Sequence, residues 1–248
     1  MTLPTFVDQR KPAAKPSLYL RETEPQSVEC PNMLAGLDER ERRHVFGLGT
    51  PLSFAPGEIV FHQGDSHQGI YIIQSGIVRS YYTAPSGREI TLAYWAPGNF
   101  VGGPDIFGES QHMWSGIAER PSQVLSLGGA ALRQLIRTIP GFALNMVEAQ
   151  AHKGKCYSAL IHMLGTRSVT ERLAQLLMLM ADLDGIRSAD GLIIGRSLTH
   201  EELAKMVGAT RQWITATLDR FREQGVIVIR KHQIILTDED KLRHIAGA

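Results

Sequence analysis

Arg211 and Gln212 stand side by side, directly after Thr210. A guanidinium group can donate two hydrogen bonds to the O6 and N7 edge of guanine, and a carboxamide can pair with N6 and N7 of adenine. Threonine is a favourable N-cap, so a helix that begins after Thr210 would present both side chains at its N-terminal end. These residues therefore predict direct contacts with base edges in double-stranded DNA.

A second helix start lies shortly before this pair. Thr199 is suited to cap it and Glu202 to close the capping box, and the helix would run from Glu201 to about Val207 and end at Gly208. The next helix would run from Arg211 to about Gln224. Two helices joined by a short turn that contains glycine predict a helix-turn-helix, whose second helix enters the major groove.

A β-hairpin wing is expected to follow these helices. Val226–Ile229 and Ile234–Leu236 are apolar, and the basic stretch Arg230–Gln233 separates them. From Arg196 to His232 the sequence holds seven basic and four acidic residues, which favours a polyanionic partner. Trp213 is either a core anchor or an aromatic side chain placed against the DNA backbone. Besides Arg211 and Gln212, the candidate DNA contacts are Thr199, His200, Thr210, Trp213, Thr215, Arg230 and Lys231.

Composition excludes several other classes of protein. The 248 residues carry a net charge of +1 and no apolar run of the roughly 18 residues that cross a bilayer. The N-terminus lacks the apolar core of a signal peptide. Cys30 and Cys156 lie far apart, which excludes a disulfide framework or a cysteine-based metal site and fits a reducing compartment. We therefore predict a cytoplasmic protein without membrane contact or bound metal.

Two further sequence patterns precede the helix-turn-helix. From about Leu52 to Leu127, short apolar runs alternate with glycine-containing turn dipeptides, which predicts an antiparallel barrel or jelly roll. Phe142–Leu164 then contains no proline and is long enough for six helical turns. Residues on this helix recur at alternating spacings of four and three, which is typical of a helix that packs along a seam. They are Ala143, Val147, Gln150, Gly154, Tyr157, Ile161 and Leu164.

This seam has two interpretations: the helix packs on its own barrel, or it pairs with a second copy at a two-fold axis. The second suits a DNA reader better and assigns dimerisation to Val147, Gly154, Tyr157, Ile161 and Leu164. The predicted fold is α+β, an N-terminal antiparallel β-roll joined by a long dimerisation helix to a C-terminal winged helix-turn-helix. The predicted parts are a flexible extension (1–32), a β-roll sensor domain (33–138), the dimerisation helix and hinge (139–166) and the DNA-binding domain (167–248).

The motifs Gly57–Asp65, Tyr71–Gly76 and Leu198–Gln212 resemble those of the Crp/Fnr family of bacterial transcription regulators, from about Leu34 to Leu242. The resemblance implies homodimers that bind pseudo-palindromic operators and couple ligand binding in the barrel to placement of the recognition helices. We expect RNA polymerase as a further partner. Many relatives carry Arg-Glu and an arginine four residues beyond the glutamate. This chain has Gln212 and Ala216 there, so its half-site should differ.

The resemblance makes the effector the open question. Relatives that bind cAMP hold the cyclic phosphate with an arginine followed by serine or threonine, whereas this chain has Met113 and Trp114 there. A buried phosphate without a guanidinium partner is costly, so we expect no ordinary cAMP binding. An atypical cyclic-nucleotide pocket is the alternative, because Phe107–Glu109 is similar to the start of the phosphate cassette. The candidate pocket residues are Gly102, Gly103, Met113, Trp114 and Ser115.

The sequence also bears on other cofactors and functions. The family's iron–sulfur members need clustered N-terminal cysteines, which Cys30 alone cannot supply, and haem-binding members use a barrel histidine, for which His67 and His112 are the weak candidates. A metal enzyme of the cupin type would need a His-x-His pair, and no such pair occurs. We therefore predict a regulator that is not an enzyme. It either senses a small molecule or is controlled by abundance, proteolysis or its N-terminal extension.

Overall fold

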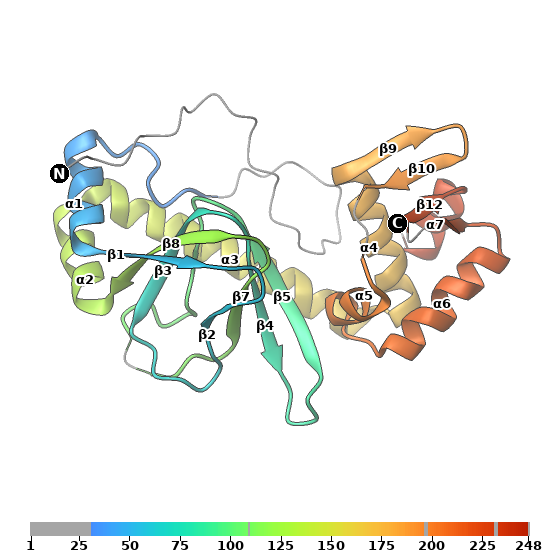
Figure 1. Ribbon diagram of the computed structural model, residues 1–248, viewed down its shortest axis with the longest axis horizontal. Coiled ribbons are helices and arrows are strands. Elements are labelled where there is room, and N and C mark those ends of the chain that lie inside the picture. Colours follow the sequence, from blue (N-terminus) through green and yellow to red (C-terminus); the bar gives the residue numbers. More distant parts are fainter. Residues whose placement is uncertain (1–30, 109, 196–197, 231–232, 248) are drawn as a thin grey trace.

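A computed structural model describes residues 31–108, 110–195, 198–230 and 233–247 (Figure 1). A β-roll lies at one end of the elongated molecule and a mostly helical domain at the other, and one long helix runs from the first to the second (Figure 1). The predicted flexible extension falls almost entirely on residues 1–30, which lie outside the described residues. Among the described residues, no helix is both long and apolar enough to cross a membrane.

The β-roll consists of two four-stranded antiparallel sheets, in the orders β1-β8-β3-β6 and β2-β7-β4-β5, with two helices beside it (Figure 1). These sheets confirm the prediction that this region is all-β. Asp38 and Glu41 form the capping box that starts the first helix. The elements are α1 (Glu39–Leu48), β1 (Thr50–Phe54), β2 (Ile59–Phe61), β3 (Gly69–Ser75), β4 (Val78–Thr83), β5 (Glu89–Trp95), β6 (Phe100–Val101), β7 (Ser115–Ala118), β8 (Ser122–Gly128) and α2 (Gly129–Thr138).

The long helix α3 (Pro140–Thr166) begins two residues earlier than predicted, because Pro140 occupies its first turn, where a missing N–H costs nothing. Its buried side chains belong to three hydrophobic cores formed by the described residues. Phe142, Met146 and Ala149 lie in the core between the roll and α1 and α2, Cys156 in the core inside the roll, and Leu160 and Met163 in the core of the C-terminal domain. The helix therefore connects the two domains through continuous packing.

The C-terminal domain consists of α4 (Val169–Asp184), β9 (Gly185–Ser188), β10 (Gly191–Ile194), α5 (His200–Val207), α6 (Arg211–Glu223), β11 (Ile227–Arg230), β12 (Gln233–Leu236) and α7 (Glu239–Ile245). The predicted wing is present as β11 and β12. It is part of a larger antiparallel sheet in the order β11-β12-β10-β9, and the hairpin β9–β10 was not anticipated from the sequence. Gly191 adopts a φ of 129°, and a Cβ there would come within 2.2 Å of the Leu236 carbonyl oxygen, so the close pairing of β10 with β12 requires glycine.

Candidate functional site

The helix-turn-helix is built by the two caps that the sequence predicts. Thr199 caps α5 and forms a reciprocal capping box with Glu202, whose carboxylate accepts from the Thr199 backbone N–H at 2.6 Å. Gly208 ends the helix in the left-handed conformation, with φ 66° and ψ 45°. The Thr210 hydroxyl then accepts from the Trp213 N–H at 3.3 Å and begins α6. These caps fix the angle at which the second helix leaves the first.

One face of α6 is buried and its N-terminal end is exposed. Ile214 and Leu218 pack in the domain core, whereas Arg211 and Gln212 are exposed. Trp213 is 47% exposed, which removes the alternative that it anchors the core. The predicted contacts therefore form one outward surface, Arg211-Gln212-Trp213, at the helix start.

Three other predicted DNA contacts are also placed. The Nδ1 atom of His200 lies 2.8 Å from the hydroxyl oxygen of Thr215, which links the start of α5 to the exposed face of α6. The guanidinium of Arg230 on the wing forms an ion pair with Asp190 in the turn between β9 and β10. Lys231 lies outside the described residues.

A cavity of about 170 Å³ lies between the β-roll and α3. It contains three of the five predicted pocket residues, Gly102, Gly103 and Trp114. Met113 instead is 60% exposed, and the hydroxyl of buried Ser115 accepts from the Gln63 backbone N–H at 3.0 Å. The residues that α3 and β4 contribute were not predicted as pocket residues, and Gly154 and Tyr157 among them were assigned to dimerisation instead. The full lining is Ser80, Val101, Gly102, Gly103, Pro104, Trp114, Gln150, Lys153, Gly154 and Tyr157.

Aromatic rings shape this cavity. The rings of Trp114 and Tyr157 meet edge to face with centroids 5.5 Å apart, and burial raises the pKa of Tyr157, which keeps its hydroxyl neutral. The ammonium of Lys153 lies 3.4 Å from the centroid of the Trp95 ring and 4.6 Å from that of Phe100. Lys153 is buried within an otherwise apolar stripe of α3. This break in the apolar pattern is the sequence signal that could have identified Lys153 as a pocket residue.

A pair of buried histidines lies behind the glycines of the cavity. The rings of His67 and His112 are 4.3 Å apart between centroids, and the Nδ1 atom of His112 lies 2.6 Å from the Gly102 carbonyl oxygen. Desolvation lowers the pKa of both rings below the usual 6.5. Gly103 has a φ of 121°, and a Cβ there would meet the His67 Nε2 atom at 3.3 Å. The histidines therefore pack against the wall of the cavity.

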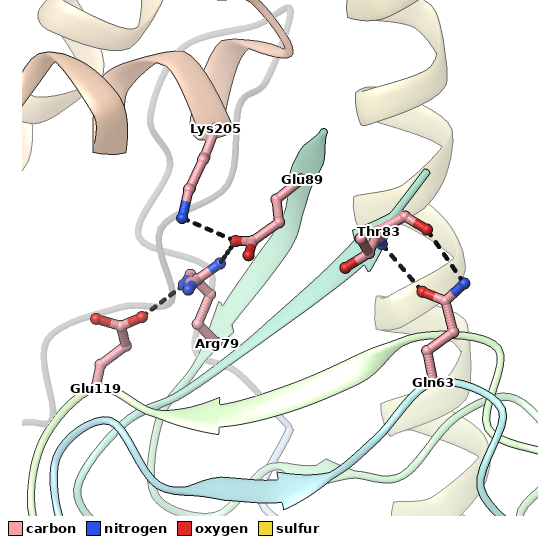
Figure 2. Close-up of polar contacts among 6 residues, drawn as sticks. All are labelled: Gln63, Arg79, Thr83, Glu89, Glu119 and Lys205. Atoms are coloured by element: carbon pink, nitrogen blue, oxygen red, sulfur yellow. Dashed lines mark hydrogen bonds and ion pairs between the residues drawn. The ribbon is translucent and has the colours of Figure 1, made fainter. Parts of the chain in front are cut away.

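The β-roll and the helix-turn-helix also touch directly. Lys205 of α5 extends to Glu89 of β5, with 3.0 Å between Nζ and Oε2, and Arg79 joins Glu89 at 3.7 Å and Glu119 at 2.5 Å (Figure 2). Beside this contact, Leu92 and Tyr94 pack against the core of the C-terminal domain. This contact between the domains has no local signal in the sequence, because Lys205 and Glu89 lie more than one hundred residues apart.

The side chains of the predicted dimerisation seam have three different surroundings. Val147 and Ile161 are 65% and 69% exposed, and Gly154 is exposed between them. Tyr157 lines the cavity, as the edge of Gly154 also does, and Leu164 packs partly against the C-terminal core. The seam that is buried within the chain lies one residue earlier, at Phe142, Met146, Ala149, Lys153, Cys156, Leu160 and Met163. The helix packs on its own roll through this earlier seam and leaves the neighbouring apolar face open.

Two family models match the chain. Residues 51–139 match a cyclic nucleotide-binding domain, and residues 171–245 match a Crp-like helix-turn-helix domain. Among curated proteins, the chain is 28% identical over 192 residues to a CRP-like cAMP-activated global transcriptional regulator of Mycobacterium tuberculosis, covering 77% of this chain and 86% of that protein. It is 27% identical over 183 residues to a global nitrogen regulator of Synechococcus elongatus, covering 73% and 82%.

Solved structures share the fold. A mutant of CooA from Carboxydothermus hydrogenoformans superposes with a TM-score of 0.71 at 22% identity, covering 89% of this chain and 97% of that one. The c-di-GMP responsive regulator CLP of Xanthomonas campestris gives a TM-score of 0.71 at 20% identity, covering 80% and 99%. Two of these similar proteins have different effectors in their names, cAMP and c-di-GMP. The likeness therefore establishes the architecture and does not identify a ligand for this chain.

Proposed function

The chain belongs to the Crp/Fnr family of DNA-binding transcription regulators, and from that premise we propose that it binds a two-fold symmetric operator as a homodimer. The observation that carries this proposal is the pairing of one exposed recognition surface, Arg211-Gln212-Trp213, with one exposed apolar face of α3. A single recognition helix reads only a half-site, and a two-fold axis along α3 supplies the second.

The open face of α3 has the spacing of a helix-pairing seam. Leu144, Val147 and Ile161 are 59%, 65% and 69% exposed, and Gly154 between them has open space where a Cβ would lie. These positions recur at intervals of three and seven residues, so they form one stripe along the helix. A second copy of the same helix is the occupant that this stripe fits, because identical stripes are self-complementary across a two-fold axis.

Selection of bound DNA from random duplexes, followed by sequencing, tests the proposal. We expect inverted half-sites with centres roughly 34–36 Å apart, one helical turn, or a multiple of that distance. We also expect the protein to sediment as a dimer without DNA. A single unrepeated half-site, or a monomer that binds with full affinity, would contradict the proposal.

We further propose that the cavity between the roll and α3 is the effector site and that its ligand is not ordinary cAMP. Arginine is absent from its described lining residues, so nothing there matches the paired acceptors of a cyclic phosphate. Trp114 forms part of the cavity wall. The cavity volume of about 170 Å³ is also below the roughly 300–1,000 Å³ of pockets that bind drug-sized ligands. Titration calorimetry should show no micromolar cAMP binding and no tightening of the operator complex.

The ligand would act on DNA binding through α3 and the contact between the domains. Lys153 and Tyr157 line the cavity, and the same helix continues to Leu160 and Met163 in the core of the DNA-binding domain. A ligand that alters the packing of α3 therefore alters the base on which the recognition helix rests. We expect RNA polymerase as the partner of the DNA-bound dimer, which transcription in vitro with purified components would test.

A further inference from the structure

We propose that the contact between the β-roll and α5 is an ionic latch, which holds the helix-turn-helix in a state of low DNA affinity and opens when DNA binds. The latch consists of Lys205 on α5 and of Arg79, Glu89 and Glu119 on the roll (Figure 2). The inference rests on the proposed function in that its test measures DNA affinity, but it requires neither the dimer nor a particular operator.

The docked β-roll works against a polyanion at α5. Lys205 is paired with Glu89 at 3.0 Å, and Arg79 with Glu119 at 2.5 Å, so the roll contributes two carboxylates and one guanidinium, a net charge of −1. In a helix-turn-helix the first helix crosses the DNA backbone. An α-helix is about 10–12 Å across, close to the Debye length of about 8–10 Å, so these carboxylates act on phosphates at the other side of α5. Glu89 and DNA therefore compete for the positive charge of Lys205.

The strand that carries Glu89 is shaped for this contact. The register between β4 and β5 shifts after Ser80 and leaves Leu92 as an extra residue, which is a β-bulge. Leu92 and Tyr94 pack against the core of the C-terminal domain. Bulges redirect side chains and are frequent next to functional sites. The docking surface is thus built into the hairpin β4–β5, and the ion pair is more than a chance approach of two surface charges.

The latch leaves two buried polar atoms without hydrogen bonds. Nη1 of Arg79 and Oε2 of Glu89 are 3.7 Å apart, and neither has a hydrogen-bond partner among the described residues, although Oε2 forms the ion pair with Lys205. A buried polar atom that lacks a hydrogen bond costs free energy, and water supplies that bond once the atom is exposed. Release of α5 exposes both atoms, so this gain offsets part of the lost attraction. The latch is therefore weak enough for DNA to open it.

Glu89→Gln tests the latch from the side that does not belong to the DNA-binding domain. It keeps the shape of the side chain and removes the charge that holds Lys205. DNA affinity at low salt should rise roughly two- to fivefold, the ratio that a partly exposed ion pair supplies. The gain should disappear at high salt, where the pair is screened. Fluorescence anisotropy measures both affinities.

Glu39→Gln is the matched control, because it makes the same change of charge at an exposed site on α1. It should bind DNA like the original protein at both salt concentrations. A folded Glu89→Gln protein whose affinity is unchanged or lower at low salt would overturn the proposal.

A covalent lock tests the same idea without relying on the stability of one variant. Lys205→Cys and Glu89→Cys, in a Cys30→Ser background, are joined by a short bis-maleimide, while Cys156 is buried and thus protected. A denaturing gel confirms that the bridge lies within one chain. The bridged protein should bind DNA roughly tenfold or more weakly than the same protein capped with N-ethylmaleimide. Equal affinity of the bridged and capped proteins would show that DNA is bound in the docked arrangement, which refutes the latch.

Both measurements use the selected operator and a random duplex in parallel, because competition for phosphates does not depend on sequence. If no symmetric operator is found, the proposed function fails, and the random duplex still decides whether the latch exists. If inverted half-sites are found and the bridged protein binds them as tightly as the capped one, the proposed function stands and the latch is refuted.

Discussion

Lys153 and Arg211 carry the same charge in opposite surroundings. Lys153 is buried against two aromatic rings beside a small cavity, whereas Arg211 stands exposed at the start of α6. A buried cation is strongly affected by whatever fills the space next to it, because little water screens it. An exposed cation is screened by water and salt, and it gains energy from a phosphate or a base edge that reaches it. The two domains thus suit a small, specific ligand and an extended polyanion respectively.

The largest expected effect comes from removing the proposed two-fold contact, which would place two copies of Arg211 on the operator. Val147→Asp together with Ile161→Asp places charge on the exposed stripe of α3, so the dimer should dissociate. Operator affinity should then fall by roughly 10²–10⁴-fold, because the second half-site is no longer bound intramolecularly. Sedimentation and fluorescence anisotropy measure the two quantities.

The control for this double variant is Arg40→Glu, which changes the net charge by the same amount at an exposed site on α1 instead of α3. It should remain dimeric. A dimeric Val147→Asp/Ile161→Asp protein would show that α3 does not form the two-fold contact.

Arg211→Ala tests the exposed cation itself. It should weaken binding to the selected operator by about 1–3 kcal/mol for each half-site and relax the preference at one base pair, because a bidentate guanine contact is lost. Arg222→Ala, at the other end of α6 and paired with Asp219, should change little. Competition between specific and random duplexes measures the effect, and unchanged sequence preference would remove Arg211 from the groove.

A smaller effect is expected where the two domains meet. Lys205→Gln breaks the ion pair with Glu89, whose side chains are 29% and 27% exposed. The contact should lose about 0.2–1 kcal/mol, and hydrogen exchange should rise in α5 and β5. Arg43→Gln in α1 breaks a pair that is far more exposed, at 72% and 61%, and serves as the control with no measurable change. Unaltered exchange in α5 would mean that apolar packing alone holds the domains together.

The smallest expected effect is a loss of stability at acid pH that is confined to the β-roll. Burial lowers the folded-state pKa of His67 and His112 below 6.5, so the unfolded chain binds protons more readily. The stability linked to these rings is present above about pH 6.5 and is lost as the pH falls through their folded values. Urea unfolding followed at pH 7.5, 6.5 and 5.5 should show the β-roll weakening with acid. His67→Asn with His112→Asn should reduce this slope, and His244→Asn, exposed on α7, should not.

Much of the fold was predictable because its signals are local. The caps at Asp38, Thr199 and Thr210 lie within three residues of the groups they bond, so the residue types alone reveal where the helices start. The turn dipeptides of the β-roll are equally local. The hairpin β9–β10 was missed because its strands are four residues each and β9 is exposed throughout, which leaves little hydrophobic pattern to read.

The sequence by itself determined the helix-turn-helix, the all-β sensor and the presence of a long helix between them. Only the tertiary structure decided which face of α3 packs on the roll, because two seams with the same spacing lie one residue apart and the spacing cannot distinguish them. That choice buries Lys153 beside a cavity and leaves Val147 and Ile161 exposed. The contact between Lys205 and Glu89 was likewise undecided, because it depends on how two separate domains dock and not on any local preference.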